Sequence, residues 1–289
     1  MEYEGNIIRP PSEAHSIILQ VTTGCSHNHC TFCGAYRDKK FRIREDELIQ
    51  ADLQFAATYC KRQKTVFLAD GNVLAIPQKK LIQLLLMIRK LLPQVRRISM
   101  YANCQDILKK SFDDLLYLKE LGVNRLYMGL ESGHDPTLES IKKGADSTRM
   151  IQAGRRVRKA GLFLSVTVLL GIAGISNSKE HALSTAQVLS KMKPNQIAVL
   201  TLMILKNTPL FEIYKNGLFQ LPNRDTLFTE LRTLISHIDS FKTQFHANHA
   251  SNYFGLDGRL PRDKNKFIDH IDAAMNGTVD LKPEALRAL

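Results

Sequence analysis

Short apolar runs alternate with longer segments of helical periodicity along the first two-thirds of the chain. The apolar runs are rich in β-branched and aliphatic residues, which favours strands, and the segments between them repeat apolar residues every three or four positions, which favours helices. Pro77 begins one helical segment, and Gly122 and Gly161 follow the ends of two others. The predicted strands are residues 16–22, 65–69, 96–101, 124–130, 163–170 and 196–205, and the predicted helices are residues 45–63, 78–92, 111–121, 148–160 and 178–192.

This alternation predicts an α/β fold built on a parallel sheet. Six strands separated by five helices of crossover length require parallel neighbours. Runs such as residues 66–69 are apolar on both faces, as expected for strands covered by helices. Because six strands fall short of the eight of a full barrel, we predict a partial (β/α)6 TIM barrel, with a doubly wound open sheet as the alternative.

The pattern changes after residue 205. A short helix is predicted over residues 208–217 and a longer one over 226–241, followed by a polar stretch at 244–253 and a last helix near 263–275. We therefore expect residues 1–205 to form the barrel with an N-terminal lead-in, and residues 206–289 to form a small, mostly helical C-terminal extension that packs on it.

Three cysteines, Cys25, Cys30 and Cys33, lie close together directly after the first predicted strand. Three thiolates on one short loop can bind three irons of a [4Fe–4S] cluster and leave the fourth iron without a protein ligand. An open metal position is typical of a catalytic site. A zinc site that adds His27 or His29 is the alternative. Structural zinc sites usually draw ligands from separate elements, whereas all candidates here fall within nine residues, which favours the cluster.

The composition describes an ordinary globular protein with a strong positive charge. Hydrophobic residues make up 44% and charged residues 24%, and the formal net charge is +12. Basic residues gather at positions 37–44 and 142–159. Such clusters attract RNA or an anionic small molecule, although charge runs on helices are more often solvated faces.

Nothing in the sequence predicts a membrane or secretory location. No apolar run approaches the roughly 20 residues that span a bilayer, and the first residues lack the basic and apolar regions of a signal peptide. Five cysteines, an odd number, argue against a disulfide framework. We therefore expect a cytoplasmic protein with no membrane association.

The cysteine loop and the motifs at later strand ends resemble the radical S-adenosyl-L-methionine (SAM) enzymes. The resemblance is closest to the subgroup that contains the oxygen-independent coproporphyrinogen oxidases, Elp3 and the MiaB methylthiotransferases, and covers about residues 16–205. Asp70-Gly71-Asn72 stands where the family has a Gly-Gly-Glu-like segment, and residues 128–133 match the segment after the fourth strand. The family usually has three residues between its first two cysteines, whereas this chain has four. The resemblance implies a partial barrel with the cluster loop after its first strand.

The resemblance also implies which residues bind SAM. Asp70 or Asn72 would accept hydrogen bonds from its amino group, Glu131 would bind the sugar and amino-acid portion, and Lys143 would bind the carboxylate. The carboxyl ends of parallel strands open on one face, so these residues are expected to meet there. No further catalytic side chain is predicted. The implied cofactor contacts are Phe32, Asp70, Gly71, Asn72, Tyr101, Asn103, Glu131, Lys143, Thr167 and Gly171, and the implied metal ligands are Cys25, Cys30 and Cys33.

The implied reaction is reductive cleavage of SAM. One electron from an oxygen-sensitive [4Fe–4S] cluster would yield methionine and a 5′-deoxyadenosyl radical, which would abstract hydrogen from a substrate. The resemblance implies an electron donor such as flavodoxin or ferredoxin. It leaves open whether SAM is consumed or regenerated.

A small-molecule substrate is the favoured expectation. The short flanks leave no room for the additional domains of methylthiotransferases, and the polar stretch after residue 244 could fold over the barrel as a lid, with His249, Asn252 and Tyr253 as substrate contacts. A solvated loop is the alternative for this stretch. Two other functions stay open: a radical SAM enzyme that modifies RNA, and a non-catalytic zinc- or iron–sulfur-bearing binding protein.

Overall fold

The computed structural model describes residues 1–288, which form two compact units. The chain changes unit in the cysteine loop and within β6 (Val123–Glu131), α6 (Ser147–Lys159) and β7 (Phe163–Leu170). The first unit comprises Met1–Asn28, Ala35–Met128 and Arg156–Leu164, and the second comprises His29–Gly34, Gly129–Arg155 and the residues from Ser165 onward.

Parallel strands form the sheet of the first unit. Its order is β1 (Ile17–Gln20), β4 (Thr65–Ala69), β5 (Arg97–Tyr101) and the first part of β6. Every residue of β4 after the first is buried, so both faces of this strand are covered, as its apolar sequence requires. A separate antiparallel pair joins β2 (Thr22–Thr23) to β3 (Arg42–Ile43).

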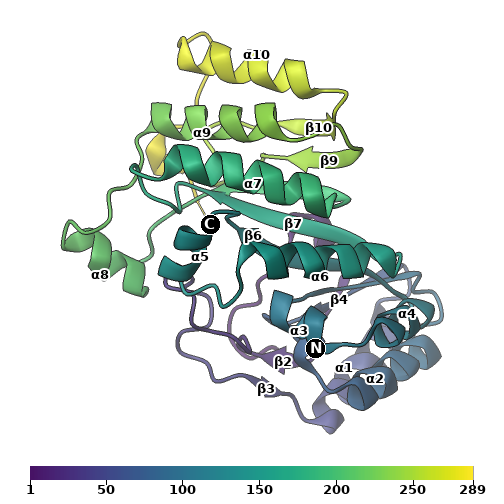
Figure 1. The fold of residues 1–289 in the computed structure, drawn as a ribbon. Coiled ribbons are helices and arrows are strands. Elements are labelled where there is room, and N and C mark those ends of the chain that lie inside the picture. Colours follow the sequence, from purple (N-terminus) through teal and green to yellow (C-terminus); the bar gives the residue numbers. More distant parts are fainter. Residues whose placement is uncertain (289) are drawn as a thin grey trace. The chain divides into compact units, whose positions relative to one another are not determined.

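The helices of the first unit follow from amphipathic periodicity and marked ends. They are α1 (Asp46–Tyr59), α2 (Gln78–Leu91), α3 (Cys104–Lys109) and α4 (Phe112–Glu120), with short 3-10 turns at Pro11–Glu13 and Val73–Ala75. α1 and α2 lie side by side (Figure 1). α2 buries Leu81, Leu84, Leu85 and Ile88, one stripe of its surface. α4 begins at a capping box, in which Ser111 and Asp114 satisfy each other's backbone N–H groups.

An aromatic group fills the core of the first unit. Tyr101 packs edge-on against Phe67, with ring centroids 5.2 Å apart, and lies 6.0 Å from the ring of Tyr127. The Tyr127 hydroxyl donates to the buried carboxylate of Glu13 at 2.5 Å. Burial raises the pKa of both tyrosines, to about 12 for Tyr127, so both rings stay neutral in this core.

The sheet of the second unit is parallel except at its edge. β7 pairs in parallel with β8 (Gln196–Thr201), β8 pairs in parallel with β9 (Thr243–His246), and β10 (Asp257–Leu260) runs antiparallel to β9. Chain order therefore matches strand order in this sheet. Such a sequential arrangement is the expected product of right-handed crossover connections.

Helices of the second unit form successive layers. α9 (Arg224–His237) lies between α7 (Ser178–Met192) and α10 (Lys264–Met275) (Figure 1). The remaining helices are α5 (Asp135–Ser140), α8 (Pro209–Lys215) and the second-unit part of α6, with a 3-10 turn at Glu284–Leu286. The Asn223 side chain caps α9 by accepting from the Thr226 backbone N–H at 2.9 Å. One face of this helix, with Leu227, Leu231 and Leu234, is apolar and buried.

The six predicted strands and five predicted helices are all present, with differences at their ends. The first strand breaks at Val21 into β1 and β2, and α1 ends at Tyr59 rather than near residue 63. The short strands β9 and β10 were not predicted. In β9 only Thr243 and Phe245 are buried, and of these only Phe245 is apolar, so the sequence shows no detectable alternation. The predicted division of the chain at residue 205 stays a prediction.

None of the helices in the described part of the chain is long and apolar enough to cross a membrane.

Candidate functional site

Cys25 lies in the first unit, against the turn that follows β4. A Cβ atom on Gly71 would lie 3.1 Å from Cys25 Cβ and 2.6 Å from the ring of Tyr36, so only glycine allows this close approach. Asn28 supports the same loop, because its side-chain amide donates to the backbone oxygen of Tyr36 at 2.7 Å. The predicted residues Cys25 and Gly71 are therefore neighbours.

Asp70 is a fully buried carboxylate at the end of β4. Its Oδ1 accepts a 2.5 Å hydrogen bond from the Tyr36 hydroxyl, and its backbone N–H donates to Thr22 Oγ1 at 3.1 Å. Burial raises the pKa of Asp70, and the Tyr36 hydrogen bond acts in the opposite direction. The Oδ2 atom is buried and accepts no hydrogen bond of good geometry from the described residues. The Gln20 side chain and the Gly24 backbone N–H also lower the pKa of this carboxyl, as Tyr36 does.

The side chain of Asn72 is already occupied by protein groups. Its Nδ2 donates to Ser26 Oγ at 2.6 Å and to Asp106 Oδ2 at 2.5 Å. Its Oδ1 accepts from the Asn103 backbone N–H at 3.1 Å. Asn103 in turn donates its side-chain amide to the sulfur of Cys25 at 3.7 Å. Asn72 therefore connects Ser26, the residue after Cys25, with Asn103, whose side chain contacts the Cys25 sulfur.

Cys30 and Cys33 belong to the second unit, on one tight turn. The backbone N–H of Cys33 donates to the carbonyl of Cys30 at 3.3 Å. Between them, Thr31 donates its N–H to the Ile141 carbonyl at 2.9 Å and accepts from the Leu210 N–H at 3.0 Å. Backbone contacts at the end of α5 and in α8 thus fix the segment that carries both thiols.

Phe32 packs against the apolar core of the second unit. Its partly buried ring contacts a cluster that includes Ile141, Leu169, Leu202 and Leu210. The aromatic side chain between the two cysteines is anchored by these contacts.

Glu131 and Lys143 form an ion pair in the second unit. Lys143 Nζ lies 3.0 Å from Glu131 Oε1, and both side chains are nearly buried. Glu131 has a positive φ of 64°, a left-handed conformation that is uncommon for a residue with a side chain and tends to occur at functional sites. Its carboxylate folds back over Gly129, where a Cβ atom would lie 2.1 Å from Oε1. The structure therefore brings these two predicted contacts together.

Gly171, at the end of β7, is tied to a buried network that the sequence did not reveal. Its N–H donates to Glu230 Oε1 at 2.7 Å, and the hydroxyl of Ser178 donates to Oε2 of the same carboxylate. His181 Nε2 lies 3.4 Å from Glu230 Oε1, and its Nδ1 lies 2.7 Å from Ser132 Oγ. Glu230 from α9 thus connects the residue after Glu131 with the end of β7.

Burial dominates the ionisation of this network. It raises the pKa of Glu230 to about 7 and lowers the pKa of His181 to about 3, because neither charged form is solvated. The signal for Glu230 was present in the sequence, since it lies on the apolar stripe of α9 three residues after Leu227. A carboxylate on a buried helix face needs a partner.

Thr167 lies within β7, opposite Ala198 of β8, and is partly exposed. Its predicted contact to SAM stays a prediction.

The predicted substrate contacts have structural partners of their own. Asn252 is buried, and its amide accepts from Thr201 Oγ1 and donates to the Val199 carbonyl, both at 2.8 Å. His249 Nδ1 lies 2.9 Å from Ser251 Oγ, and burial lowers the pKa of His249. These two side chains shape the 249–253 stretch, and their substrate role stays a prediction.

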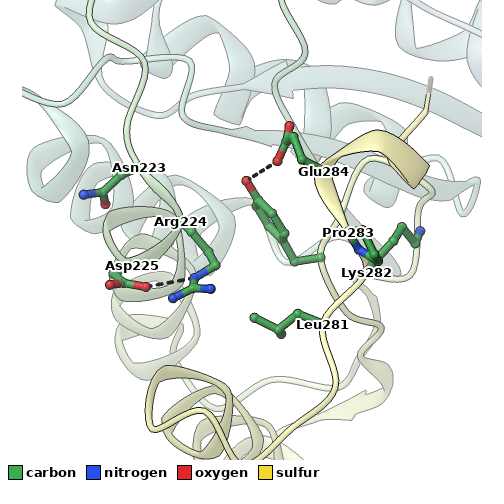
Figure 2. Close-up of a pocket in the computed structure, with 8 residues that line it drawn as sticks. Asn223, Arg224, Asp225, Leu281, Lys282, Pro283 and Glu284 are labelled. Carbon is green, nitrogen blue, oxygen red and sulfur yellow. Dashed lines mark hydrogen bonds and ion pairs between the residues drawn. The ribbon is translucent and has the colours of Figure 1, made fainter.

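Tyr253 lines an open cleft of about 560 Å³ between the start of α9 and the C-terminal segment. Figure 2 shows Arg224 paired with Asp225 on one side and Lys282 and Glu284 on the other. The Tyr253 hydroxyl donates to Glu284 Oε2 at 2.7 Å.

Comparison with known proteins identifies the family. The model of the radical SAM superfamily matches residues 19–186, more than half of the chain and inclusive of all three loop cysteines. The chain belongs to the radical SAM superfamily. It is therefore an enzyme whose cofactors are a [4Fe–4S] cluster and SAM, as the resemblance in its sequence implied.

Individual relatives are distant. The heme chaperone HemW of Bacillus subtilis (strain 168) is 26% identical over 193 residues, which cover 65% of this chain and 48% of the relative. Biotin synthase of Thermodesulfovibrio yellowstonii is 22% identical over 292 residues, covering 92% of this chain and 88% of the relative. The chain spans about half the length of the heme chaperones it matches.

The fold prediction is confirmed by solved structures. Coproporphyrinogen III oxidase (HemN) from Escherichia coli aligns with a TM-score of 0.57 at 15% identity, covering 76% of this chain and 51% of that one. The structural neighbours are partial TIM barrels, and the present chain is a mixed α/β protein of that class.

Each of the three loop cysteines is a partly exposed thiol outside any disulfide, and such soft donors suit an iron–sulfur cluster. An amide N–H already points at one of the sulfurs, as is common for cluster thiolates.

Proposed function

We propose that this enzyme cleaves SAM and uses the resulting 5′-deoxyadenosyl radical to abstract a hydrogen atom from a small-molecule substrate. When bound, the cluster supplies the electron that splits SAM into methionine and a 5′-deoxyadenosyl radical. The match of the family model across the complete cysteine loop carries this proposal. The protein's own contribution is to bind, orient and shield the reactants.

Cys25, Cys30 and Cys33 are proposed as the cluster ligands. The turn that links Cys30 and Cys33 is fixed by backbone hydrogen bonds, and the Cys25 sulfur accepts from Asn103.

Asp70 is proposed as the acceptor for the SAM amino group. Its Oδ2 is buried without a hydrogen bond of good geometry among the described residues, whereas the amide of Asn72 is fully engaged. An ammonium group placed there would satisfy this oxygen and neutralise the carboxylate. Of the two residues that the sequence left open, the contacts favour Asp70.

Lys143 and Glu131 are proposed as a charged pair that binds the remainder of SAM. Lys143 would face the carboxylate, and its 3.0 Å contact would hold Glu131 in an orientation that accepts from the sugar hydroxyls. Phe32, Gly71, Tyr101, Asn103, Thr167 and Gly171 remain proposed as the surrounding contacts.

The test is anaerobic. The protein is reconstituted with iron and sulfide, given SAM and dithionite, and assayed for 5′-deoxyadenosine. We expect about four irons per chain and product formation in the wild type, neither in Cys30→Ala, and both in the matched control Cys60→Ala, a cysteine at the end of α1. Iron-loaded protein that neither binds nor cleaves SAM would contradict the proposal.

The substrate class has its own test. A small molecule and RNA differ in how binding responds to salt, because phosphate contacts weaken steeply as counterions compete. We expect no salt-sensitive RNA binding above background, despite the net charge of +12. Retention of RNA at low salt with a steep loss at higher salt would favour RNA modification instead.

Heme binding is a second candidate. Several relatives are named heme chaperones, and their similarity covers 58–70% of this chain. Titration with hemin, followed by the Soret absorption band, tests this candidate. A saturable one-to-one change would support heme binding, and a linear, unsaturable response would exclude it.

A further inference from the structure

The side chain of Asn103 points at the sulfur of Cys25. Its Nδ2 lies 3.7 Å from Cys25 Sγ, within the range of an N–H donor to sulfur. A thiolate can only accept, so the contact requires the amide nitrogen on this side. Asn103 is therefore a hydrogen-bond donor to a proposed cluster ligand.

Asn103 makes this contact in place of a helix-capping hydrogen bond. It occupies the N-cap position of α3, with the extended backbone typical of that position, and asparagine is among the residues preferred there. Its side chain forms no capping hydrogen bond to the helix. The amide is instead directed away from the helix end and toward the sulfur.

Both partners are held by the same buried side chain. Asn72 accepts from the Asn103 backbone N–H at 3.1 Å and donates at 2.6 Å to Ser26, the residue after Cys25. Asp106 receives the second hydrogen atom of the Asn72 amide and also accepts from Ser26 at 3.3 Å. Asn72 is fully buried, so its hydrogen bonds to Ser26 and Asn103, rather than solvent, determine the distance between the Asn103 amide and the Cys25 sulfur.

We propose that Asn103 is a positioning residue that tunes the reduction potential of the cluster through Cys25. A hydrogen bond to a ligand sulfur withdraws charge from it, which favours the reduced cluster because that state carries one more electron. The donor therefore raises the potential and eases electron transfer from the external reductant. This inference rests on the proposed function, since it requires Cys25 to ligate iron.

The test measures potential rather than turnover. Wild type and Asn103→Leu, which keeps the side-chain size and removes the donor, are reconstituted anaerobically and titrated with dithionite in the absence of SAM. The reduced cluster is followed by electron paramagnetic resonance. We expect a more negative midpoint potential in the variant. Asn124→Leu, the same change at an exposed position of β6, is the matched control and should leave the potential unchanged.

Further variants separate the outcomes. If Asn103→Leu does not fold, Asn103→Ser replaces it, because the serine side chain is too short to reach the sulfur, and the same negative shift is expected. Asn103→Gln retains an amide donor and should recover part of the potential. A fully loaded Asn103→Leu or Asn103→Ser protein with the wild-type potential would overturn the inference. Failure of the wild type to assemble any cluster would instead overturn the proposed function.

Discussion

Replacement of Glu230 by glutamine should change how stability depends on pH. Glu230 is 1% exposed, and its carboxylate receives hydrogen bonds from Gly171 and Ser178. Glutamine has the same shape and can accept from Gly171 while donating to the serine oxygen, so the packing is retained and only the ionisable group is lost. His181, the titratable neighbour, stays neutral in the folded protein across the pH range that matters because its pKa is lowered to about 3.

The magnitude follows from the pKa of Glu230. Burial raises it from 4.5 to about 7, so the folded protein binds this proton more tightly than the unfolded chain does. The stabilisation from the raised pKa is therefore complete below pH 4.5 and is lost as the pH rises to 7. The loss amounts to about 3 kcal/mol, at roughly 1.4 kcal/mol for each unit of pKa. Glutamine lacks this dependence, so Glu230→Gln should gain about 3 kcal/mol relative to wild type between these pH values.

Urea denaturation of both proteins at half-unit steps from pH 4.5 to 8 measures this difference. Subtracting the two curves removes every group that titrates equally in both. Glu212→Gln, at an exposed position of α8, controls for loss of one negative charge. A difference between Glu230→Gln and wild type that stays constant across the pH range would refute the reasoning.

Three further substitutions test other parts of the structure. Tyr36→Phe removes a hydrogen bond that lowers the pKa of Asp70. The Asp70 carboxylate should then be protonated at a higher pH, so that, as the pH falls, SAM binding is lost earlier than in wild type. Equilibrium dialysis across pH 5.5–8.5 measures this shift. Gly133→Ala places a Cβ atom 2.5 Å from the backbone oxygen of Ser184, and should lower the free energy of unfolding by about 1–3 kcal/mol, measured with urea. Arg44→Met removes the buried guanidinium that pairs with Asp52 of α1. Asp52 then keeps only the Glu2 N–H and the N-terminal ammonium, 3.9 Å away, so the change should cost about 3–5 kcal/mol in the same assay.

The sequence was most informative where burial is uniform. The strand at residues 65–69 was predicted because it is apolar on both faces, and β4 is indeed buried on both. Strand ends could also be ranked as site candidates, since polar residues such as Asp70 follow buried runs and parallel strands present these ends together.

Side-chain partners could not be predicted in the same way. Asn72 looked equivalent to Asp70, yet its amide is engaged by Asp106, 34 residues later in the chain. Asn252 looked available to a substrate, yet it binds Thr201 and Val199, more than 50 residues earlier. Hydrogen bonds over such separations depend on the complete fold, and no local pattern encodes them.

The backbone anchoring of Thr31 has an evolutionary consequence. This residue, between two of the cysteines, is held through its N–H and carbonyl, while its buried hydroxyl has no hydrogen-bond partner among the described residues. Selection on this position should therefore act on volume rather than on chemical type. Valine would be tolerated, whereas proline, which lacks the N–H, would not. Substitutions that keep the volume of Thr31 should therefore leave the positions of Cys30 and Cys33 unchanged.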